Sequence, residues 1–369
     1  MAAAVHDWSE RAGIAEQTIV RRHLRRLSGV LPGTRIGRIR WPRRVPAWPF
    51  PWHFWWQAHL LDCLVDAQLR SPNPRRARAV GMLVRGVRLH NAGSWVNRYN
   101  DDIAWLGLAV QRAGTLARRS GPSALLAISQ RLGEGWTEDG GGGIWWRRDD
   151  DFKNAPANGP AAIFLARHDR LRRAQQMSDW LDETLIDPET HLVFDGIKGG
   201  SMVRAQYTYC QGVVLGLETE LALRTEDADH AKRVHRLVAA VRDNMAPEGI
   251  IRGAGGGDGG LFNGILARYL ALVATSLPQN DADDAEARQT ASKLVLDSAE
   301  AAWDNRQTVD SLPLFAAFWE RTAEIPTAAG KEAEFVEGAV NASEIPERDL
   351  SVQLSGWMLM EAAHAVSDT

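Results

Sequence analysis

The sequence has little of what several protein classes require. Its 369 residues include only two cysteines, Cys63 and Cys210, and each lies in an apolar helical pattern, so buried free thiols are expected rather than a disulfide framework. There is no CxxC pair and no HExxH motif, and the ten histidines lack the spacing of metal ligands. A GxxxxGK(S/T) phosphate-binding loop is also missing. We therefore expect neither a metal site nor a cofactor.

Long apolar runs are missing as well. No stretch approaches 18 apolar residues, so no transmembrane segment is expected. The first residues lack the basic and apolar regions of a signal peptide, so we expect a cytoplasmic location for the chain as given, and secretion if a leader has been removed. The net charge of −3 and a pI near 6.4 argue against a nucleic-acid partner. We expect a monomer.

Helical periodicity dominates the sequence, whereas the alternation typical of strands is nearly absent. Apolar residues recur at helical spacing in twelve segments, which are residues 53–70, 78–90, 101–117, 122–133, 155–168, 171–186, 205–224, 229–245, 261–277, 284–302, 311–321 and 349–365. The strongest apolar helices begin about every 50 residues over much of the chain, a period that indicates a repeated helical hairpin. Six such hairpins predict an all-α fold, an (α/α)6 barrel of about twelve helices.

The loops before alternate helices have an unusual composition. They are rich in glycine, aromatic residues, asparagine and aspartate, as in "NAGSWVNRYNDD" and "GAGGGDGGLFNG", whereas the loops between them are shorter and plain. If the helices alternate between an inner and an outer ring, the unusual loops all fall at one end of the barrel. Trp95, Trp145 and Trp146 in these loops offer flat indole faces, which match the C–H face of a sugar ring. We therefore expect one functional face.

The first 50 residues differ from the rest. We expect residues 1–50 to form a basic N-terminal extension and residues 51–369 to form the catalytic barrel. Residues 21–44 contain nine arginines and no acidic residue. These arginines either pair with acids on the outer helices or contact an anionic glycolipid or polymer.

Two adjacent carboxylates, Asp101 and Asp102, stand where an aromatic loop turns into an apolar helix. One interpretation is structural: Asn100 as N-cap, with both acids in the first turn, would satisfy backbone N–H groups and suit the helix dipole. The other is chemical, because glycoside hydrolysis needs two carboxyl groups. One protonates the leaving oxygen, and the other attacks the anomeric carbon or activates water.

The spacing of this pair predicts how it would react. Successive residues at a helix start diverge by about 100°, so two carboxyl groups can flank a bound bond. Their adjacent backbones favour a short separation of about 5–5.5 Å, which is typical of retaining enzymes. Two charges about 5 Å apart at an effective dielectric near 20 repel by about 3 kcal/mol. Such repulsion corresponds to roughly two pKa units, enough to keep one aspartate protonated.

Four segments occur in a characteristic order: "YNDDIAWLGLAVQRAG", "GGGIWWRRDDDFKNAPANGPAAIFLAR", "YTYCQGVVLGLETELA" and "DGGLFNGILARYLALV". Together they resemble glycoside hydrolase family 76, the endo-α-1,6-mannanases. The resemblance covers nearly all of the chain, from "HFWWQAHLLDCLVDA" to "DLSVQLSGWMLMEAAHA". It implies an (α/α)6 barrel and endo-acting, retaining hydrolysis of α-1,6-mannoside linkages. The implied partner is an α-1,6-linked mannose polymer, oligosaccharide or mannose-containing glycolipid.

The resemblance also implies roles for single residues. Asp101 is expected to be the nucleophile and Asp102 the acid/base. Besides Trp95 and Trp145, which the loop composition suggests, the residues expected to bind substrate are Tyr99, Asn100, Trp146, Asn154, Tyr207, Gln211, Asp258 and Phe262. A single cleft is expected to bring together Asp101, Asp102, Trp146, Gln211 and Asp258.

Two other functions stay open at this point. Sugar epimerases of the acylglucosamine type share the barrel, but they need paired catalytic histidines on inner helices, and the sequence offers no convincing pair. A carbohydrate-binding barrel without turnover would also suit the aromatic face. Cys210 stands where the family motif more often has asparagine, a departure that would fit a shifted substrate.

Overall fold

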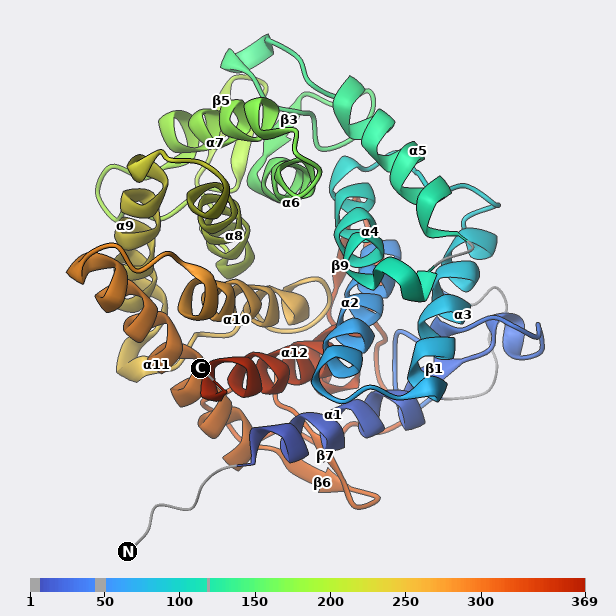
Figure 1. Ribbon diagram of the computed structural model, residues 1–369. Coiled ribbons are helices and arrows are strands. Elements are labelled where there is room, and N and C mark those ends of the chain that lie inside the picture. The colour runs from blue at the N-terminus through green and yellow to red at the C-terminus, as the bar shows by residue number, and fades with distance from the viewer. Residues whose placement is uncertain (1–6, 44–50, 118–119, 369) are drawn as a thin grey trace, which may run out of the picture.

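The computed structural model describes residues 7–43, 51–117 and 120–368 of the chain. Helices form a closed ring around one axis, and the strands of the described chain are short (Figure 1). Six inner helices pack side by side and close on themselves: α2 (Phe54–Arg70), α4 (Asn100–Ala113), α6 (Ala155–Ala166), α8 (Thr208–Arg224), α10 (Gly259–Ser276) and α12 (Leu350–Ser367). This arrangement confirms the predicted all-α, (α/α)6 barrel.

Six further helices cover the ring from outside. They are α1 (Trp8–Arg22), α3 (Pro74–His90), α5 (Gly121–Glu134), α7 (Leu171–Leu185), α9 (Ala228–Met245) and α11 (Ala282–Asp304). An outer helix buries only the face that meets the ring, so its apolar residues recur at helical spacing. Inner helices are enclosed on most sides, and every residue of α6 is buried. The two rings therefore correspond to two kinds of apolar pattern.

Glycines allow three of the inner helices to approach closely. A Cβ atom at Gly212 of α8 would lie 3.0 Å from the Cα atom of Leu266 in α10. One at Gly264 of α10 would lie 2.7 Å from the Cα atom of Ser355 in α12. At Gly264 this contact with backbone is closer than real Cβ atoms allow, and at Gly212 the neighbouring helix would have to move by a few tenths of an ångström. Glycine therefore sets the close approach at both crossings.

One predicted helix is wrong, and one helix was missed. Residues 311–321 hold strand β7 (Leu312–Leu314), which pairs with β6 (Gln307–Val309), followed by a buried loop. Their apolar side chains are buried, but not on a helix. The remaining helix is α1, which packs against α12. Two of its buried apolar residues are alanine, Ala12 and Ala15, so its apolar signal is weak. Residues 8–22 of the expected extension thus supply an outer helix.

The other strands lie in the connections: β1 (Leu24–Arg25), β2 (Ile36–Gly37), β3 (Phe152–Asn154), β4 (Gly196–Lys198), β5 (Ser201–Val203), β8 (Glu334–Val336) and β9 (Ala339–Asn341). Strands β3, β4 and β5 form one antiparallel sheet. Strands β3 to β5, β8 and β9 occur in the connections that lead into α6, α8 and α12, so they lie at the end of the ring where inner helices begin. None of the described helices is long and apolar enough to cross a lipid bilayer.

Candidate active site

The aspartate pair lies in the first turn of α4, at the end of the barrel that carries the aromatic loops. The backbone N–H of Asn100 donates to the carbonyl of Trp146 (2.7 Å), and its side-chain amide donates to the carbonyl of Trp145 (2.7 Å). Tyr99, not Asn100, occupies the N-cap position. The predicted capping role of Asn100 is wrong, because its amide ties the tryptophan loop to the helix instead.

The two carboxylates have different partners. Asp101 accepts the backbone N–H of Asp102 with one oxygen (2.9 Å) and the indole N–H of Trp146 with the other (2.9 Å). Asp102 accepts the side-chain amide of Asn97 (2.5 Å). The interpretation of the pair as helix-capping residues therefore explains the position of only one oxygen of Asp101, the one that accepts a backbone N–H of the first turn. The other two contacts come from the loop residues Trp146 and Asn97. These groups are uncharged, so they orient the carboxylates without neutralising their charge.

Both aspartates hold protons more tightly than an exposed carboxyl group does. Burial raises the pKa of Asp101 to about 7, and the charge of Asp258 adds to this effect, while the N–H groups of Asp102 and Trp146 oppose it. For Asp102, burial and then the charge of Asp101 raise the pKa well above its usual value. Mutual repulsion thus acts in the expected direction, but burial is the larger cause.

Asp258 adds a third carboxylate next to the pair. It directly precedes α10 and accepts the indole N–H groups of Trp55 (2.9 Å) and Trp56 (3.0 Å) with one oxygen. Its other oxygen accepts the backbone N–H of Val340 (2.7 Å). Burial raises its pKa to about 6. Among the ion pairs of the described residues, none involves Asp101, Asp102 or Asp258.

Aromatic rings form a wall beside these acids. Tyr209 and Phe262 stack with ring centroids 3.9 Å apart and planes 1° apart. Tyr207 lies 5.2 Å from Phe262 and is 39% exposed, and Trp55 lies 6.4 Å from Phe262. Burial raises the pKa of Tyr209, and after Asp195 and Cys210 the charges of Asp101 and Asp258 add to this effect, which places the wall next to the carboxylates. Flat apolar rings beside carboxylates are suited to a sugar.

Several residues expected to bind substrate have structural contacts instead. Gln211 is fully buried, and its amide bonds to both the N–H and the carbonyl of Val193. Asn154 is buried and caps α6 through the N–H of Ala157 (3.2 Å). Trp95 is also buried, in the hydrophobic core. Polar groups that are enclosed and already hydrogen-bonded have no capacity left for a ligand. Gln211 and Asn154 therefore position the chain around the site.

Of the neighbouring tryptophans Trp145 and Trp146, one has a structural contact and the other reaches the aspartate pair. Trp146 contacts Asp101, and its ring lies 5.3 Å from that of Tyr99. Trp145 is covered by the ammonium of Lys153, which lies 4.6 Å from the centroid of its ring. Only the second of the two indoles therefore reaches the carboxylates. Tyr99 stays at the edge of the site, close to the guanidinium of Arg147.

Sequence reasoning missed other residues of the site. Trp55 and Trp56 hold Asp258 from more than 200 residues away, Asn97 holds Asp102, and Tyr209 stacks on Phe262. The first two belong to the segment "HFWWQAHLLDCLVDA", but the sequence does not tell which of its rings points inward. Close to the wall, the thiol of Cys210 lies 3.7 Å from Asp195, whose pKa burial raises to about 6.

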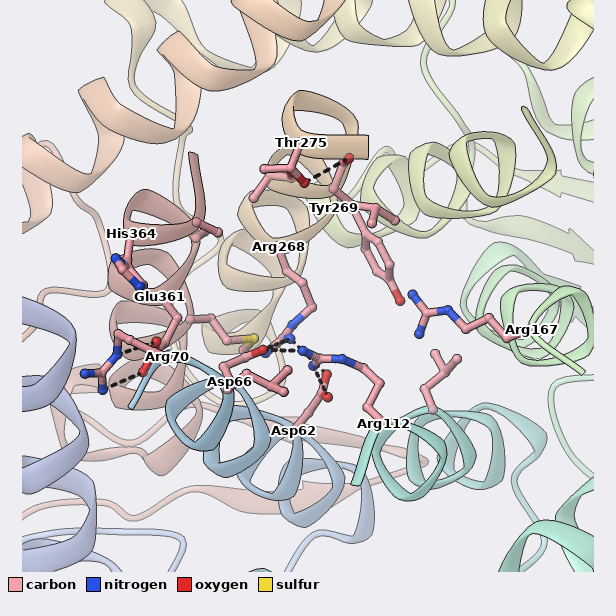
Figure 2. A pocket seen from close by; sticks show the side chains of 17 residues that line it. Asp62, Asp66, Arg70, Arg112, Arg167, Arg268, Tyr269, Thr275, Glu361 and His364 are labelled. Carbon is pink, nitrogen blue, oxygen red and sulfur yellow. Dashed lines mark hydrogen bonds and ion pairs between the residues drawn. The ribbon is translucent and has the colours of Figure 1, made fainter. Parts of the chain in front are cut away.

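A cavity of about 380 Å³ lies at the opposite end of the barrel, among the last turns of the inner helices. Figure 2 shows Asp62 and Asp66 facing Arg112 and Arg268, with Arg70 bonded to Glu361 nearby. Here each acid has a guanidinium partner, and the pKa of Asp62 is lowered to about 2, because the charges of Arg112 and Arg268 outweigh burial. The carboxylate of Asp62 therefore stays charged near neutral pH.

A third group of ionisable residues has the composition of a metal site. His235, Asp281 and Asp284, between α9 and α11, bring their ligand atoms within 4.8 Å of one another. They already bond among themselves, since His235 contacts Asp284 (2.7 Å) and Asp281 caps α11 through the N–H of Asp284. The group belongs to two outer helices, whereas the aspartate pair begins the inner helix α4.

The site has paired carboxylates and stacked aromatic rings at one end of two concentric rings of helices. These features are typical of an enzyme that cleaves glycosidic bonds. Comparison with known families agrees. The profile of glycosyl hydrolase family 76 matches residues 12–355. The chain therefore belongs to glycosyl hydrolase family 76.

Solved structures support the same conclusion. The GH76A α-1,6-mannanase from Salegentibacter sp. HEL1_6 is 28% identical, with a TM-score of 0.81 over 98% of this chain and 100% of the other. An inactive variant of that mannanase, in which two consecutive aspartates are replaced by asparagine, has been solved with α-1,6-mannotriose. The Lin0763 protein from Listeria innocua shares the fold at 24% identity, with a TM-score of 0.80 over 98% of this chain and 97% of the other. No curated protein sequence matches the chain.

Proposed function

We propose that the protein is a retaining, endo-acting hydrolase of α-1,6-linked mannose chains. The observation that carries the proposal is the pair Asp101 and Asp102: two adjacent carboxyl groups with different partners and raised pKa values, beside a third acid and an aromatic wall. The relative that binds α-1,6-mannotriose is inactive when two consecutive aspartates are replaced. In this chain, Asp101 and Asp102 are the consecutive pair that lies next to the aromatic wall.

The environments of the two acids support a division of roles. Asp101 keeps an indole N–H on one oxygen, which stabilises its charged form. It attacks the anomeric carbon, forming a glycosyl ester as the bond to the leaving oxygen breaks. Asp102, whose pKa lies well above the usual range, donates its proton to that oxygen. It then takes a proton from water, which attacks the same carbon and releases Asp101.

Product analysis tests the substrate and the mode of cleavage. On a panel of polysaccharides, the enzyme should degrade only those with α-1,6-linked mannose and should release a ladder of oligosaccharides. Release of mannose alone would contradict endo action. Proton NMR of the first product should show retained α configuration, and a first product of inverted configuration would contradict the covalent intermediate.

Azide distinguishes the roles of the two aspartates. With an activated mannosyl donor, Asp102→Ala should still form the glycosyl ester, and azide should intercept it to give a product of retained configuration. With Asp101→Ala no ester forms, and azide should enter the vacated space to give the inverted product. If the Asp102 variant gives the inverted azide, the two assignments must be exchanged.

A further inference from the structure

The arginines of residues 21–44 do not behave as one surface. Arg22 is buried, and its guanidinium donates to the carbonyls of Val309 (2.6 Å) and Pro313 (2.6 Å). Arg40 pairs with Glu332 (2.6 Å). These two arginines therefore have structural roles. Arg44 lies outside the described residues.

Several arginines of this segment, Arg40 among them, surround a small pocket. It encloses about 60 Å³, and its basic lining consists of Arg25, Arg26, Arg38, Arg40 and Arg43, with His90 from the end of α3. Its apolar lining consists of Leu27, Ile36, Ile39, Pro51 and Trp52. No acidic residue occurs among the described residues that line it. A concave site with one sign of charge and low-polarity walls concentrates ions of the opposite sign.

Three of the arginines that line this pocket, Arg25, Arg26 and Arg38, have no acidic partner among the described residues. Arg25 donates to the backbone carbonyls of Arg21 (2.6 Å) and Leu24 (2.7 Å), and none of the ion pairs of the described residues involves Arg25, Arg26 or Arg38. The charge of Arg25 is among the causes that lower the pKa of Arg38, after burial. Like charges held together without a counter-charge are unfavourable in the empty protein, and a bound anion would remove that repulsion.

The backbone holds these side chains in place. Strand β1 pairs with β2 in the register Leu24 to Gly37 and Arg25 to Ile36. Gly37 in turn accepts from and donates to the side-chain amide of Gln57 in α2 (3.0 and 2.7 Å). The pocket is thus attached to the first turns of the inner helix whose Trp55 and Trp56 hold Asp258. Its lining residues Pro51 and Trp52 come just before α2, so the pocket lies at the end of the barrel where inner helices begin.

We infer that this pocket binds a phosphate ester group carried by the mannose-containing substrate. Arginine forks match the oxygens of a phosphate and keep their charge at all relevant pH values. Trp52 and the aliphatic side chains suit the carbon part of an ester better than they suit a fully hydrated free ion. The inference rests on the proposed function, because it assumes a glycan in the cleft next to the pocket. The ester is either a soluble glycan phosphate or a lipid headgroup.

Kinetics on two matched substrates test the inference. One is α-1,6-mannotetraose, and the other is the same glycan with a phosphate ester at one end, prepared with the ester at either end. For the wild type, the phosphate at the correct end should lower KM about tenfold at low salt and less at high salt. Arg25→Gln/Arg38→Gln should lose this preference and keep its kcat and KM for mannotetraose. The control Arg75→Gln/Arg78→Gln removes the same charge from exposed positions at the other end of α3 and should keep the preference.

Binding measurements separate this inference from the proposed function. Titration with methyl mannoside 6-phosphate, and sedimentation with phosphatidylcholine vesicles with and without phosphatidylglycerol, need no turnover. Binding of either probe that weakens at least tenfold in Arg25→Gln/Arg38→Gln supports the site, and which probe binds identifies the source of the ester. Arg25→Lys/Arg38→Lys keeps the charges and should retain part of the binding, and thermal melting checks that each variant is folded. If the wild type binds neither probe, or the glutamine variant binds as well as the wild type, the inference is wrong.

Discussion

Buried carboxylates occur at both ends of the barrel, and they differ in what faces them. At the end where inner helices begin, Asp101 and Asp102 meet an indole, an amide and each other, and the pKa of Asp101 rises to about 7. At the other end, Asp62 and Asp66 meet Arg112 and Arg268, and the pKa of Asp62 falls to about 2. Burial raises the pKa of both Asp101 and Asp62, so the neighbouring charges decide whether the pKa ends above or below its usual value.

The largest expected effect is a loss of activity when the aspartate pair is changed. Asp101→Asn and Asp102→Asn should each lower kcat/KM on α-1,6-mannan at least about 1,000-fold, because a nucleophile or a proton donor is lost. Initial rates of reducing-sugar release measure this loss, with circular dichroism to confirm folding. Asp229→Asn, which alters an exposed ion pair with Lys232, is a control that should keep full activity. Substantial activity in either Asp variant would leave only the capping interpretation.

The second expected effect is a loss of stability, without loss of activity, when the arginines at the opposite end are changed. Arg268→Met leaves Asp62 and Asp66 with one guanidinium instead of two, so the free energy of unfolding should fall by about 3 kcal/mol. Urea denaturation measures it. Lys232→Met breaks an exposed pair and should cost less than about 1 kcal/mol. Below its unfolding transition, Arg268→Met should retain kcat, and a large loss of kcat there would mean that the far end takes part in the reaction.

The third effect concerns the indole on the nucleophile. Trp146→Phe removes the N–H that donates to Asp101, so the pKa of Asp101 should rise and the acidic limb of the pH–rate profile should move to higher pH. Near pH 6, kcat/KM should fall about tenfold or more, in line with a hydrogen bond to a charged group worth about 1.5–3 kcal/mol. Trp145→Phe is the matched control, since its ring faces Lys153. Equal profiles for the two variants would contradict the role given to Trp146.

The smallest effect is an opposite response of the two ends to pH. An aspartate with a raised pKa stabilises the fold below its unfolded pKa, near 3.8, and loses that contribution as the pH rises through its folded pKa. Between pH 4 and 8, the melting temperature of Asp101→Asn/Asp102→Asn should therefore rise relative to the wild type, by about 2 °C. For Asp62 the pKa is lowered, so its contribution is present above pH 4 and lost toward pH 2. The deficit of Asp62→Asn should shrink over that range, and differences that stay flat with pH would contradict both assignments.

Local patterns predicted the ring and the place of the aspartate pair well. Helical periodicity depends on residues three or four apart, so it located α4 and the acids in its first turn. The same reasoning failed for residues 311–321, whose apolar run is buried in a strand and a loop, and for α1, whose alanines carry little signal. An apolar pattern indicates that a segment buries one of its faces. It does not tell whether the segment is a helix or a strand, or which element packs against that face.

The residues around the acids were predicted less well. Motif similarity selected Gln211 and Asn154, whose side-chain oxygens accept backbone N–H groups. It passed over Trp55 and Trp56, which hold Asp258 across 203 and 202 residues. A polar residue in a motif satisfies either the backbone or a ligand, and only the surrounding contacts distinguish the two uses.

The sequence by itself determined the repeated helical hairpin, the helix start that carries Asp101 and Asp102, and the aromatic character of one end. Each of these depends on residues close together in the chain. The tertiary structure alone decided which acids keep their protons, because a pKa depends on burial and on charges brought together from distant helices: Asp258 near the pair, Arg112 and Arg268 around Asp62. It also decided which arginines of residues 21–44 are paired and which surround a pocket, since Glu332 and the carbonyls of β6 and β7 lie almost 300 residues away.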